Sequence, residues 1–157
     1  MINILDYLYL QYPNSNQLSI SRVMKLLYLI EWRFAITKFD KLTDIDWLKT
    51  EYGPFYKSLR SIFNESSNFE VIIKIDNYNK EQLVINFLNK KENYILRTDT
   101  KDTIDFVIAH CINYSWTELN TLVNSTYGVL NTPQGQLINM VVSAKQYIKE
   151  FNNSKKR

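Results

Sequence analysis

The residues that could carry out catalysis are few in this chain. Its one histidine, His110, stands next to its one cysteine, Cys111, within the apolar run FVIAHCI. Adjacent side chains on a helix point about 100° apart, so this pair does not predict a nucleophile with its base. A histidine in such a pattern is typical of a partly buried structural residue. Because zinc needs a cluster of Cys and His ligands, the pair does not predict a zinc site either.

Three aspartates, Asp40, Asp44 and Asp46, could ligate a hard cation. Their spacing matches no calcium-binding loop, so they are typical of a solvated loop. With three glycines in 157 residues, the chain also contains no glycine-rich phosphate-binding loop. Two carboxylates from distant segments could still meet for acid–base catalysis, which a sequence does not reveal. We expect no catalytic residue, no metal and no cofactor, and therefore no enzyme.

Glu31 is the titratable residue in the most unusual position. On a helix with about 100° per residue, it falls in the middle of an apolar face, between Leu27 and Ala35. A carboxylate there must have a partner, or the face must open at that point. One interpretation is a structural ion pair with Lys38, Arg22 or a basic residue of another helix. The other is a polar anchor at the floor of a binding groove, with an environment-sensitive pKa.

Two further stretches have the composition of a contact surface. Trp47 precedes the run EYGPF at 51–55, in which aromatic residues flank a rigid Gly-Pro corner. Tyr and Trp bury much area at little entropic cost, so we expect a contact patch here. We also expect one of the two rings, Trp47 or Phe55, to pack against the helix of residues 19–39 instead. The second stretch, at 125–128, is rich in hydroxyls and is typical of a helix end.

The composition favours a binding role, but it does not identify the partner. Aromatic residues make up 14% of the chain, which is more large rings than the core of 157 residues needs, so some should lie at a contact surface.

The net charge is +3, with three basic residues in the last three positions, typical of a solvated tail. The start lacks the basic region of a signal peptide, and no run of about 18 apolar residues predicts a membrane span. A single cysteine excludes an intrachain disulfide, and we expect the cytoplasm.

The longest helical pattern runs from Ser19 to Phe39 and contains no glycine or proline. Ser19 is a suitable N-cap, because its hydroxyl can accept a hydrogen bond from an unpaired backbone N–H of the first turn. Apolar residues occupy most of the circumference, which indicates burial on more than one side. We predict this segment to be the central helix of the fold, and it would hold Glu31.

Shorter patterns predict the remaining elements. Pro54 suits the first turn of a helix, since its missing N–H would be unpaired there. Ser115 and Glu118 fit a capping box. We predict further helices at 2–12, 54–64, around the stripe 104–111, at 115–124, and from Thr132-Pro133 to Phe151. Between them, runs rich in β-branched residues predict strands at 69–75 and 82–88, a turn at 90–93 and a third short strand at 94–97.

The predicted fold class is therefore α+β and mostly helical. It is a single domain with a long central buried helix and a small antiparallel β-hairpin or meander. We place the domain at residues 1–151 and a basic flexible tail at 152–157.

Several of these stretches together resemble a known family. KLLYLIEWRF at 25–34, Leu42-Thr43, WLKTEYGPF at 47–55 and ELNTLVNSTYG at 118–128 are similar to the Panacea domain, also called the SocA-like antitoxin domain. The chain departs from the late part of that pattern, because Gly128 stands where a proline often follows the tyrosine. By matching position, the family residues are Lys25, Leu26, Leu27, Tyr28, Glu31, Gly53, Pro54, Ser125, Thr126 and Tyr127.

The resemblance implies a mostly helical antitoxin of a bacterial or phage toxin–antitoxin pair, which neutralises its toxin by direct protein–protein contact. It implies no catalytic residue and no cofactor. We accordingly expect a cognate protein toxin as the partner, and neither nucleic acid nor a membrane. The expected partner-binding residues are Glu31, Trp47, Tyr52, Gly53, Pro54, Phe55, Ser125, Thr126 and Tyr127.

Three other interpretations remain open at the level of sequence. A nucleic-acid-binding regulator is suggested by the basic pI of about 8.8. A proteolytic adaptor would deliver a client to a protease complex through the tail at 152–157. A hydrolase that depends on His110 is the most distant of the three.

Overall fold

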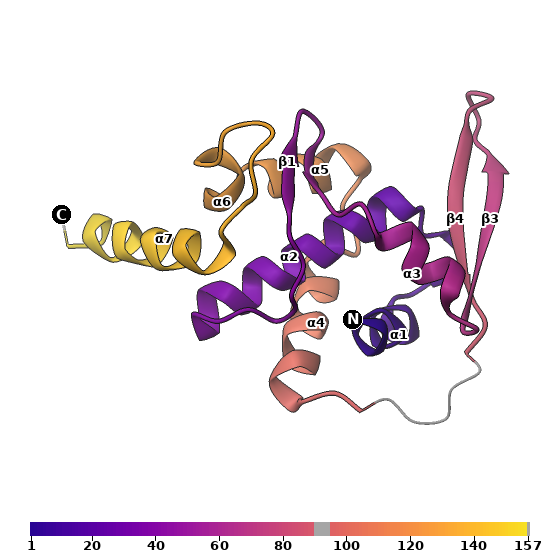
Figure 1. Cartoon of the computed structure of the whole chain (residues 1–157), viewed down its shortest axis with the longest axis horizontal. Coiled ribbons are helices and arrows are strands. Elements are labelled where there is room, and N and C mark those ends of the chain that lie inside the picture. Colours follow the sequence, from indigo (N-terminus) through magenta and orange to yellow (C-terminus); the bar gives the residue numbers. More distant parts are fainter. Residues whose placement is uncertain (90–94, 157) are drawn as a thin grey trace. The chain divides into compact units, whose positions relative to one another are not determined.

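Helices make up most of the structure, and two short antiparallel strand pairs complete it (Figure 1). The computed structural model describes residues 1–89 and 95–156. The predicted class, a mostly helical α+β fold with a long buried helix and an antiparallel hairpin, is confirmed. The chain divides into two compact units, which are Met1–Met24 with Lys57–Asn113 and Lys25–Tyr56 with Tyr114–Arg157.

The first unit combines short helices with the longer of the two hairpins. Its elements are α1 (Ile2–Gln11), the 3-10 turn η1 (Ser15–Gln17), α3 (Leu59–Glu65), β3 (Phe69–Ile75), β4 (Glu81–Phe87) and α4 (Thr98–Cys111). The elements of the second unit are β1 (Leu48–Thr50), β2 (Gly53–Phe55), α5 (Trp116–Asn124), α6 (Tyr127–Leu130) and α7 (Met140–Ser154). The division between the units falls within α2 (Ile20–Lys38).

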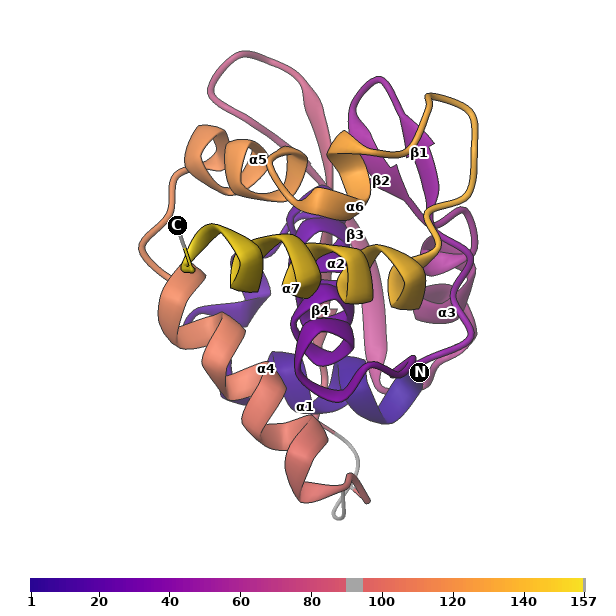
Figure 2. The same cartoon turned by 90° about the vertical axis from the view of Figure 1, so that its left-hand side faces the viewer.

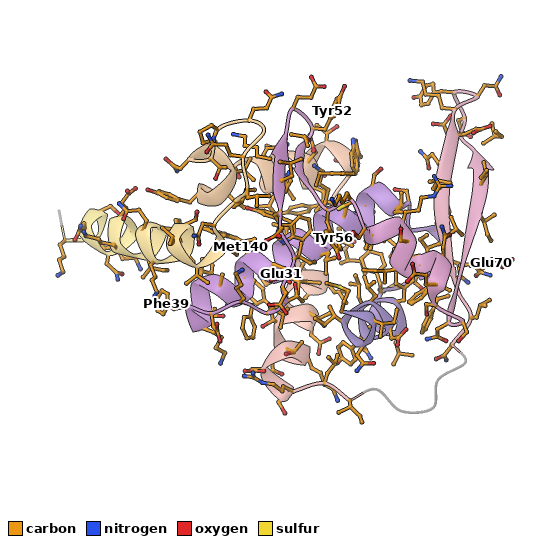
Figure 3. The ribbon with its side chains drawn as sticks, viewed as in Figure 1. Glu31, Phe39, Tyr52, Tyr56, Glu70 and Met140 are labelled. Carbon is orange, nitrogen blue, oxygen red and sulfur yellow. The ribbon has the colours of Figure 1, made fainter. Side chains whose placement is uncertain are left out.

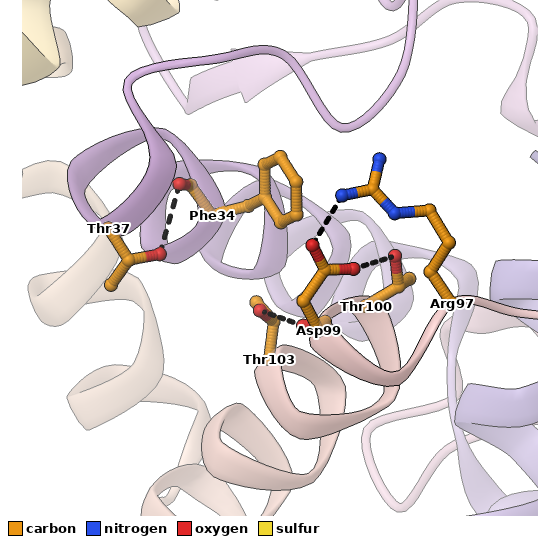
Figure 4. A network of polar contacts seen from close by, with 6 residues as sticks. All are labelled: Phe34, Thr37, Arg97, Asp99, Thr100 and Thr103. Atoms are coloured by element: carbon orange, nitrogen blue, oxygen red, sulfur yellow. Dashed lines mark hydrogen bonds and ion pairs between the residues drawn. The ribbon is translucent and has the colours of Figure 1, made fainter.

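Helix α2 matches its prediction closely. It begins one residue after Ser19, whose Oγ accepts a hydrogen bond from the backbone N–H of Arg22 at 3.2 Å. Near its other end, the hydroxyl of Thr37 donates to the carbonyl of Phe34 at 3.1 Å (Figure 4). Every residue from Lys25 to Trp32 is buried, which is more than two turns of helix. The helix is therefore covered all round, as its apolar circumference predicted.

An aromatic cluster attaches the hairpin β3–β4 to the helices of the first unit. The ring of Tyr9 in α1 lies 5.1 Å from Phe69 and 5.9 Å from Phe63, both in edge-to-face geometry. Phe69 in turn meets Phe87 across the two strands at 5.3 Å. Such pairs add stability beyond the area that they bury, so the base of the hairpin is held firmly.

The predicted meander is a hairpin in the described residues. Strands β3 and β4 pair antiparallel over their whole length. Residues 90–94, which include the predicted second turn and the start of the third strand, lie outside the described residues. Residues 95–97 form no strand, so that part of the prediction is wrong. Arg97 instead takes the N-cap position of α4, and its guanidinium contacts the carboxylate of Asp99 in the first turn at 2.5 Å (Figure 4).

The predicted start of a helix at Pro54 is wrong. Pro54 lies in β2, opposite Lys49 of β1, and α3 begins only at Leu59. A proline cannot donate to a strand ladder, but it is tolerated in an edge strand, and both strands of a two-stranded sheet are edges. The sequence preference for a helix N-terminus was therefore overridden by the pairing of β2 with β1.

The last helix also begins later than predicted. Instead of starting at Thr132-Pro133, α7 starts at Met140, after Asn139 caps it by accepting from the backbone N–H of Val142 at 3.2 Å. The preceding residues 135–138 run antiparallel to β1. The N–H of Ile138 donates to the carbonyl of Trp47 at 2.8 Å, and the N–H of Lys49 to the carbonyl of Gln136 at 2.9 Å. These bonds satisfy backbone groups that a longer helix would have used internally.

Helices α5, α6 and α7 complete the second unit (Figure 2). The capping box at the start of α5 is confirmed, since Ser115 accepts from the N–H of Glu118 and Glu118 accepts from the N–H of Ser115. Helix α5 packs against β2, and α6 packs against both α5 and α7. Helix α7 ends at Ser154, three residues after the predicted end at Phe151.

We predict that Ser115→Ala lowers the free energy of unfolding by about 1 kcal/mol, because the N–H of Glu118 then loses its acceptor. Urea unfolding followed by circular dichroism measures the change. Ser21→Ala, at an exposed position inside α2, is the control and should leave the stability within about 0.5 kcal/mol of the wild type. An equal effect of both substitutions would contradict the role of the capping box.

Candidate functional site

Every residue predicted to bind a partner lies in the second unit, but the structure sorts these residues into two groups. Tyr52, Phe55 and Ser125 are exposed, and Tyr127 is half-buried. The others are buried, namely Glu31, Trp47, Gly53, Pro54 and Thr126. The exposed residues can therefore contact a partner, whereas the buried residues can act only by supporting that surface.

The exposed part is centred on the hairpin β1–β2, whose tip carries Tyr52 (Figure 3). The side chain of Tyr52 is 76% exposed, and that of Phe55 is 43% exposed. The hydroxyl of Thr50 donates to the carbonyl of Gly53 at 2.8 Å and accepts from the N–H of Tyr52 at 3.2 Å. The turn is thus closed by its own hydrogen bonds and holds Tyr52 in solvent, and Phe55, the last residue of β2, is exposed as well.

Lys25 supports this turn from below. Its side chain is buried, and its Nζ donates to the carbonyl of Tyr52 at 2.5 Å. Burial lowers the pKa of Lys25 to about 8. A buried ammonium is costly unless it is hydrogen-bonded, so this contact ties the backbone of the turn to α2. Lys25 is named above only as a residue of the family pattern and is not among the predicted partner-binding residues.

The turn strongly favours glycine at position 53. Its φ of +98° is a conformation that other residues rarely adopt. A Cβ at this position would also lie 2.6 Å from Oδ1 of Asn124 and 2.7 Å from Nζ of Lys25. Because Gly53 has no side chain, Asn124 of α5 and Lys25 of α2 can both pack against the backbone at this position.

Trp47 belongs to the support and not to the surface. It is 1% exposed, and its ring meets Tyr28 of α2 edge-to-face at 5.3 Å. Within the described residues, its indole N–H has no hydrogen-bond acceptor. Since Phe55 is exposed, the expectation that one of these two rings packs against the central helix is confirmed.

A chain of hydroxyls joins α2 to the end of α5. The hydroxyl of Thr126 donates to the carbonyl of Val123 at 2.8 Å, so its oxygen accepts from the hydroxyl of Tyr28 at 3.0 Å. Burial raises the pKa of Tyr28 to about 12, which keeps the phenol neutral and able to donate. Gly128 adjoins this site, where a Cβ would lie 3.1 Å from the hydroxyl of Tyr28. The glycine thus lets α6 approach α2 closely.

Glu31 is 3% exposed and bonds to the loop after α2. Its carboxylate accepts from the hydroxyl of Thr43 and from the backbone N–H groups of Leu42 and Thr43. Burial raises the pKa of Glu31 to about 7, although these hydrogen bonds hold it lower than burial alone would. Its donors in the second unit are neutral groups of this loop and not Lys38, so the ion pair proposed between those two residues is wrong.

The hydroxyl-rich segment after α5 is divided between a cap and a new helix. Ser125 is the C-cap of α5, as its type suggested, and its Oγ donates to the carbonyl of Leu122 at 2.8 Å. Tyr127 begins α6 and donates from its hydroxyl to Oε1 of Glu150 in α7 at 2.8 Å. This hydrogen bond raises the pKa of Tyr127. Its phenol is therefore occupied in joining α6 to α7.

The residues considered for catalysis lie in the first unit. His110 is exposed, stacks on Phe106 with 3.9 Å between ring centres, and donates from Nδ1 to the carbonyl of Phe106 at 2.7 Å. Cys111 is buried, and burial raises the pKa of its thiol, which disfavours the reactive thiolate.

Among residues 1–89 and 95–156, no three His, Cys, Asp or Glu side chains gather closely enough to hold a metal ion. In the same residues, no helix has the length and apolar character needed to cross a membrane.

Comparison with known proteins identifies one family. The model of the family described as "Antitoxin SocA-like, Panacea domain" matches residues 23–126, which is about two thirds of the chain. No curated protein and no solved structure matches the chain. The matched range includes α2 from Val23 onward, the loop that binds Glu31, the hairpin β1–β2 and α5.

We predict that Gly53→Ala destabilises the protein by about 2–4 kcal/mol, because it adds a steric clash to the cost of a positive φ. Gly135→Ala separates these two causes, since Gly135 has a φ of +81° but no atom within 4 Å of an added Cβ. It should cost only about 1 kcal/mol. Thermal or urea unfolding of both variants checks the difference, and equal losses would show that the packing of Lys25 and Asn124 against the corner is unimportant.

We predict that Glu31 makes the stability of the protein depend on pH. Its folded pKa of about 7 lies above the ordinary value of 4.5, so its contribution is complete below pH 4.5 and is lost as the pH rises through about 7. Relative to Glu31→Gln, the wild type should therefore lose about 3 kcal/mol of unfolding free energy between pH 4.5 and about pH 8. Urea unfolding across this range measures the difference.

Glu65→Gln, at an exposed position, is the control for this experiment and should retain the pH dependence of the wild type. The prediction fails if Glu31→Gln and the wild type lose stability in parallel over the whole range.

Proposed function

The chain belongs to the SocA-like antitoxin, Panacea domain family, and on that premise we propose that it neutralises a cognate protein toxin by binding it directly. The observation that carries the proposal is the family match over residues 23–126. The system would be a bacterial or phage toxin–antitoxin pair in the cytoplasm. The antitoxin would act by binding and would perform no reaction of its own.

The hairpin β1–β2 is the surface that we assign to the toxin. Tyr52 in the turn and Phe55 at the end of β2 expose aromatic side chains, and the matched range contains both residues. Exposed aromatic residues are the usual anchors of protein–protein interfaces, because they bury a large area with few rotatable bonds. Ser125 would contribute a polar contact at the margin, since it is exposed.

The buried members of the predicted set would act through this surface. Lys25 bonds to the carbonyl of Tyr52, and Gly53 gives the turn its shape. A turn that is already held in one conformation loses less entropy when it binds, which favours affinity. Trp47, Pro54 and Thr126 contribute to the same support, as each is buried in the second unit. Glu31 would contribute indirectly, by holding the loop at Leu42 and Thr43.

We predict that Tyr52→Ala weakens toxin binding by about 2 kcal/mol, or roughly thirtyfold in Kd, because it removes an exposed aromatic anchor. The test is co-expression with the product of the neighbouring reading frame, with growth rescue and co-purification as readouts. Tyr78→Ala is the matched control, since Tyr78 is a similarly exposed tyrosine at 84%, on the hairpin turn of the first unit. It should leave rescue and binding unchanged.

Two outcomes would contradict the proposal at different levels. If the neighbouring product is not toxic, or the wild-type chain neither rescues growth nor co-purifies with it, the antitoxin role fails for that pair. If the wild type binds and Tyr52→Ala binds equally well, the role stands but the assignment of the hairpin β1–β2 is wrong.

A further inference from the structure

Strand β3 of the first unit has an open outer edge. Strand β4 has partners on both sides, because the N–H of Ile85 donates to the carbonyl of Leu18 at 3.2 Å and Ser19 pairs with Val84. Within residues 1–89 and 95–156, strand β3 pairs with β4 on one side only. The pairing continues without interruption from Phe69 to Ile75, so no bulge or proline protects the edge.

The ladder determines which backbone groups point outward. The N–H of Leu88 donates to the carbonyl of Asn68, and that of Asp76 donates to the carbonyl of Lys80. Because hydrogen-bonded pairs alternate along an antiparallel ladder, the even-numbered residues of β3 bond to β4. The backbone groups of the odd-numbered residues therefore face outward. Among the described residues, no hydrogen bond from another segment reaches those of 71, 73 or 75.

The side chains of β3 divide cleanly between its two faces. Those of Phe69, Val71, Ile73 and Ile75 share one face, by the alternation of a strand. Phe69 is buried in the aromatic cluster, but Ile73 and Ile75 are 59% and 60% exposed. The apolar face thus continues from the core to the distal half of the hairpin, where it is uncovered. The opposite face carries two opposite charges, Glu70 and Lys74.

These charges are placed symmetrically about Ile72. If two copies of β3 pair antiparallel about a two-fold axis at Ile72, Glu70 of each copy lies opposite Lys74 of the other. In this register, Val71 lies opposite Ile73, so the outward backbone groups meet as hydrogen-bonded pairs. A shift of two residues places Glu70 opposite Asp76 or Lys74 opposite Asn68, and both charge pairs are lost. Charge complementarity therefore selects a single register.

We propose that β3 binds the β3 strand of a second copy of this chain, which joins the two hairpins into a four-stranded antiparallel sheet. Among the described residues, each exposed charge has a single long contact. Lys74 Nζ donates to the carbonyl of Asn16, and Asn86 Nδ2 donates to Glu70 Oε2, both at 3.4 Å. Contacts of this length compete weakly with a directly opposed ion pair. Figure 3 shows Glu70 beside the hairpin, directed away from the rest of the first unit. The dimer needs no toxin and is independent of the proposed function.

Charge reversal tests the register as well as the interface. Sedimentation equilibrium of the full chain should show a dimer of twice the 18.7 kDa monomer mass. Glu70→Lys and Lys74→Glu each create two like-charged pairs and should raise the dissociation constant about tenfold or more. An equimolar mixture of these two variants should dimerise again, because each of its two pairs is then of opposite charge. The double variant should also dimerise.

Glu81→Lys is the matched control, since it makes the same charge change at an exposed position of β4, away from the open edge, and it should dimerise like the wild type. Circular dichroism confirms that each variant is folded. The proposal is overturned if the wild type is a monomer at every concentration, or if Glu70→Lys dimerises as tightly as the wild type. It is equally overturned if the edge variants leave a monomer unchanged but weaken binding to the toxin, because β3 would then serve the toxin.

Discussion

The second unit depends on two charges that α2 buries. An ammonium or a carboxylate away from water is costly unless hydrogen bonds compensate it. Lys25 obtains its acceptor from the carbonyl of Tyr52, and Glu31 obtains its donors from Leu42 and Thr43. In both cases the partner belongs to a connection and not to a helix. The cost of burying each charge is therefore offset only when the loop that carries its partner adopts one conformation. In this way helix α2 determines the conformation of the loops around it.

This arrangement explains why so few of the predicted binding residues are exposed. Glu31, Trp47 and Thr126 are among the residues predicted to bind a partner, and the structure places all three below the surface. A polar or aromatic residue within an apolar pattern indicates a constraint, but it does not distinguish a contact with a partner from a contact inside the fold. That distinction depends on which segments cover the helix. Lys25 was missed for the same reason, because its acceptor lies 27 residues away in the chain.

The fold was predictable where local patterns and tertiary packing agree. Helix α2 and the strands β3 and β4 have strong periodicity, and the structure confirms them to within a residue or two. The prediction failed where a stretch that resembles a helix start instead adopts an extended backbone and pairs with another strand. Pro54 pairs opposite Lys49, and residues 135–138 run beside β1, although both stretches look like helix starts. Nothing in the local sequence reveals a ladder whose two strands are about 90 residues apart.

The range of residues matched by the family model does not coincide with either of the two compact units. It begins at Val23, inside α2, and ends at Thr126, just before α6. Yet α1 supplies Tyr9 to the aromatic cluster of the first unit, and Tyr9 is 1% exposed. In the second unit, α7 supplies Tyr147 against Trp32, with 5.8 Å between ring centres. Because both contacts cover core residues of the matched range, the flanking helices are part of the folded protein, and the matched segment by itself would expose apolar surface in each unit.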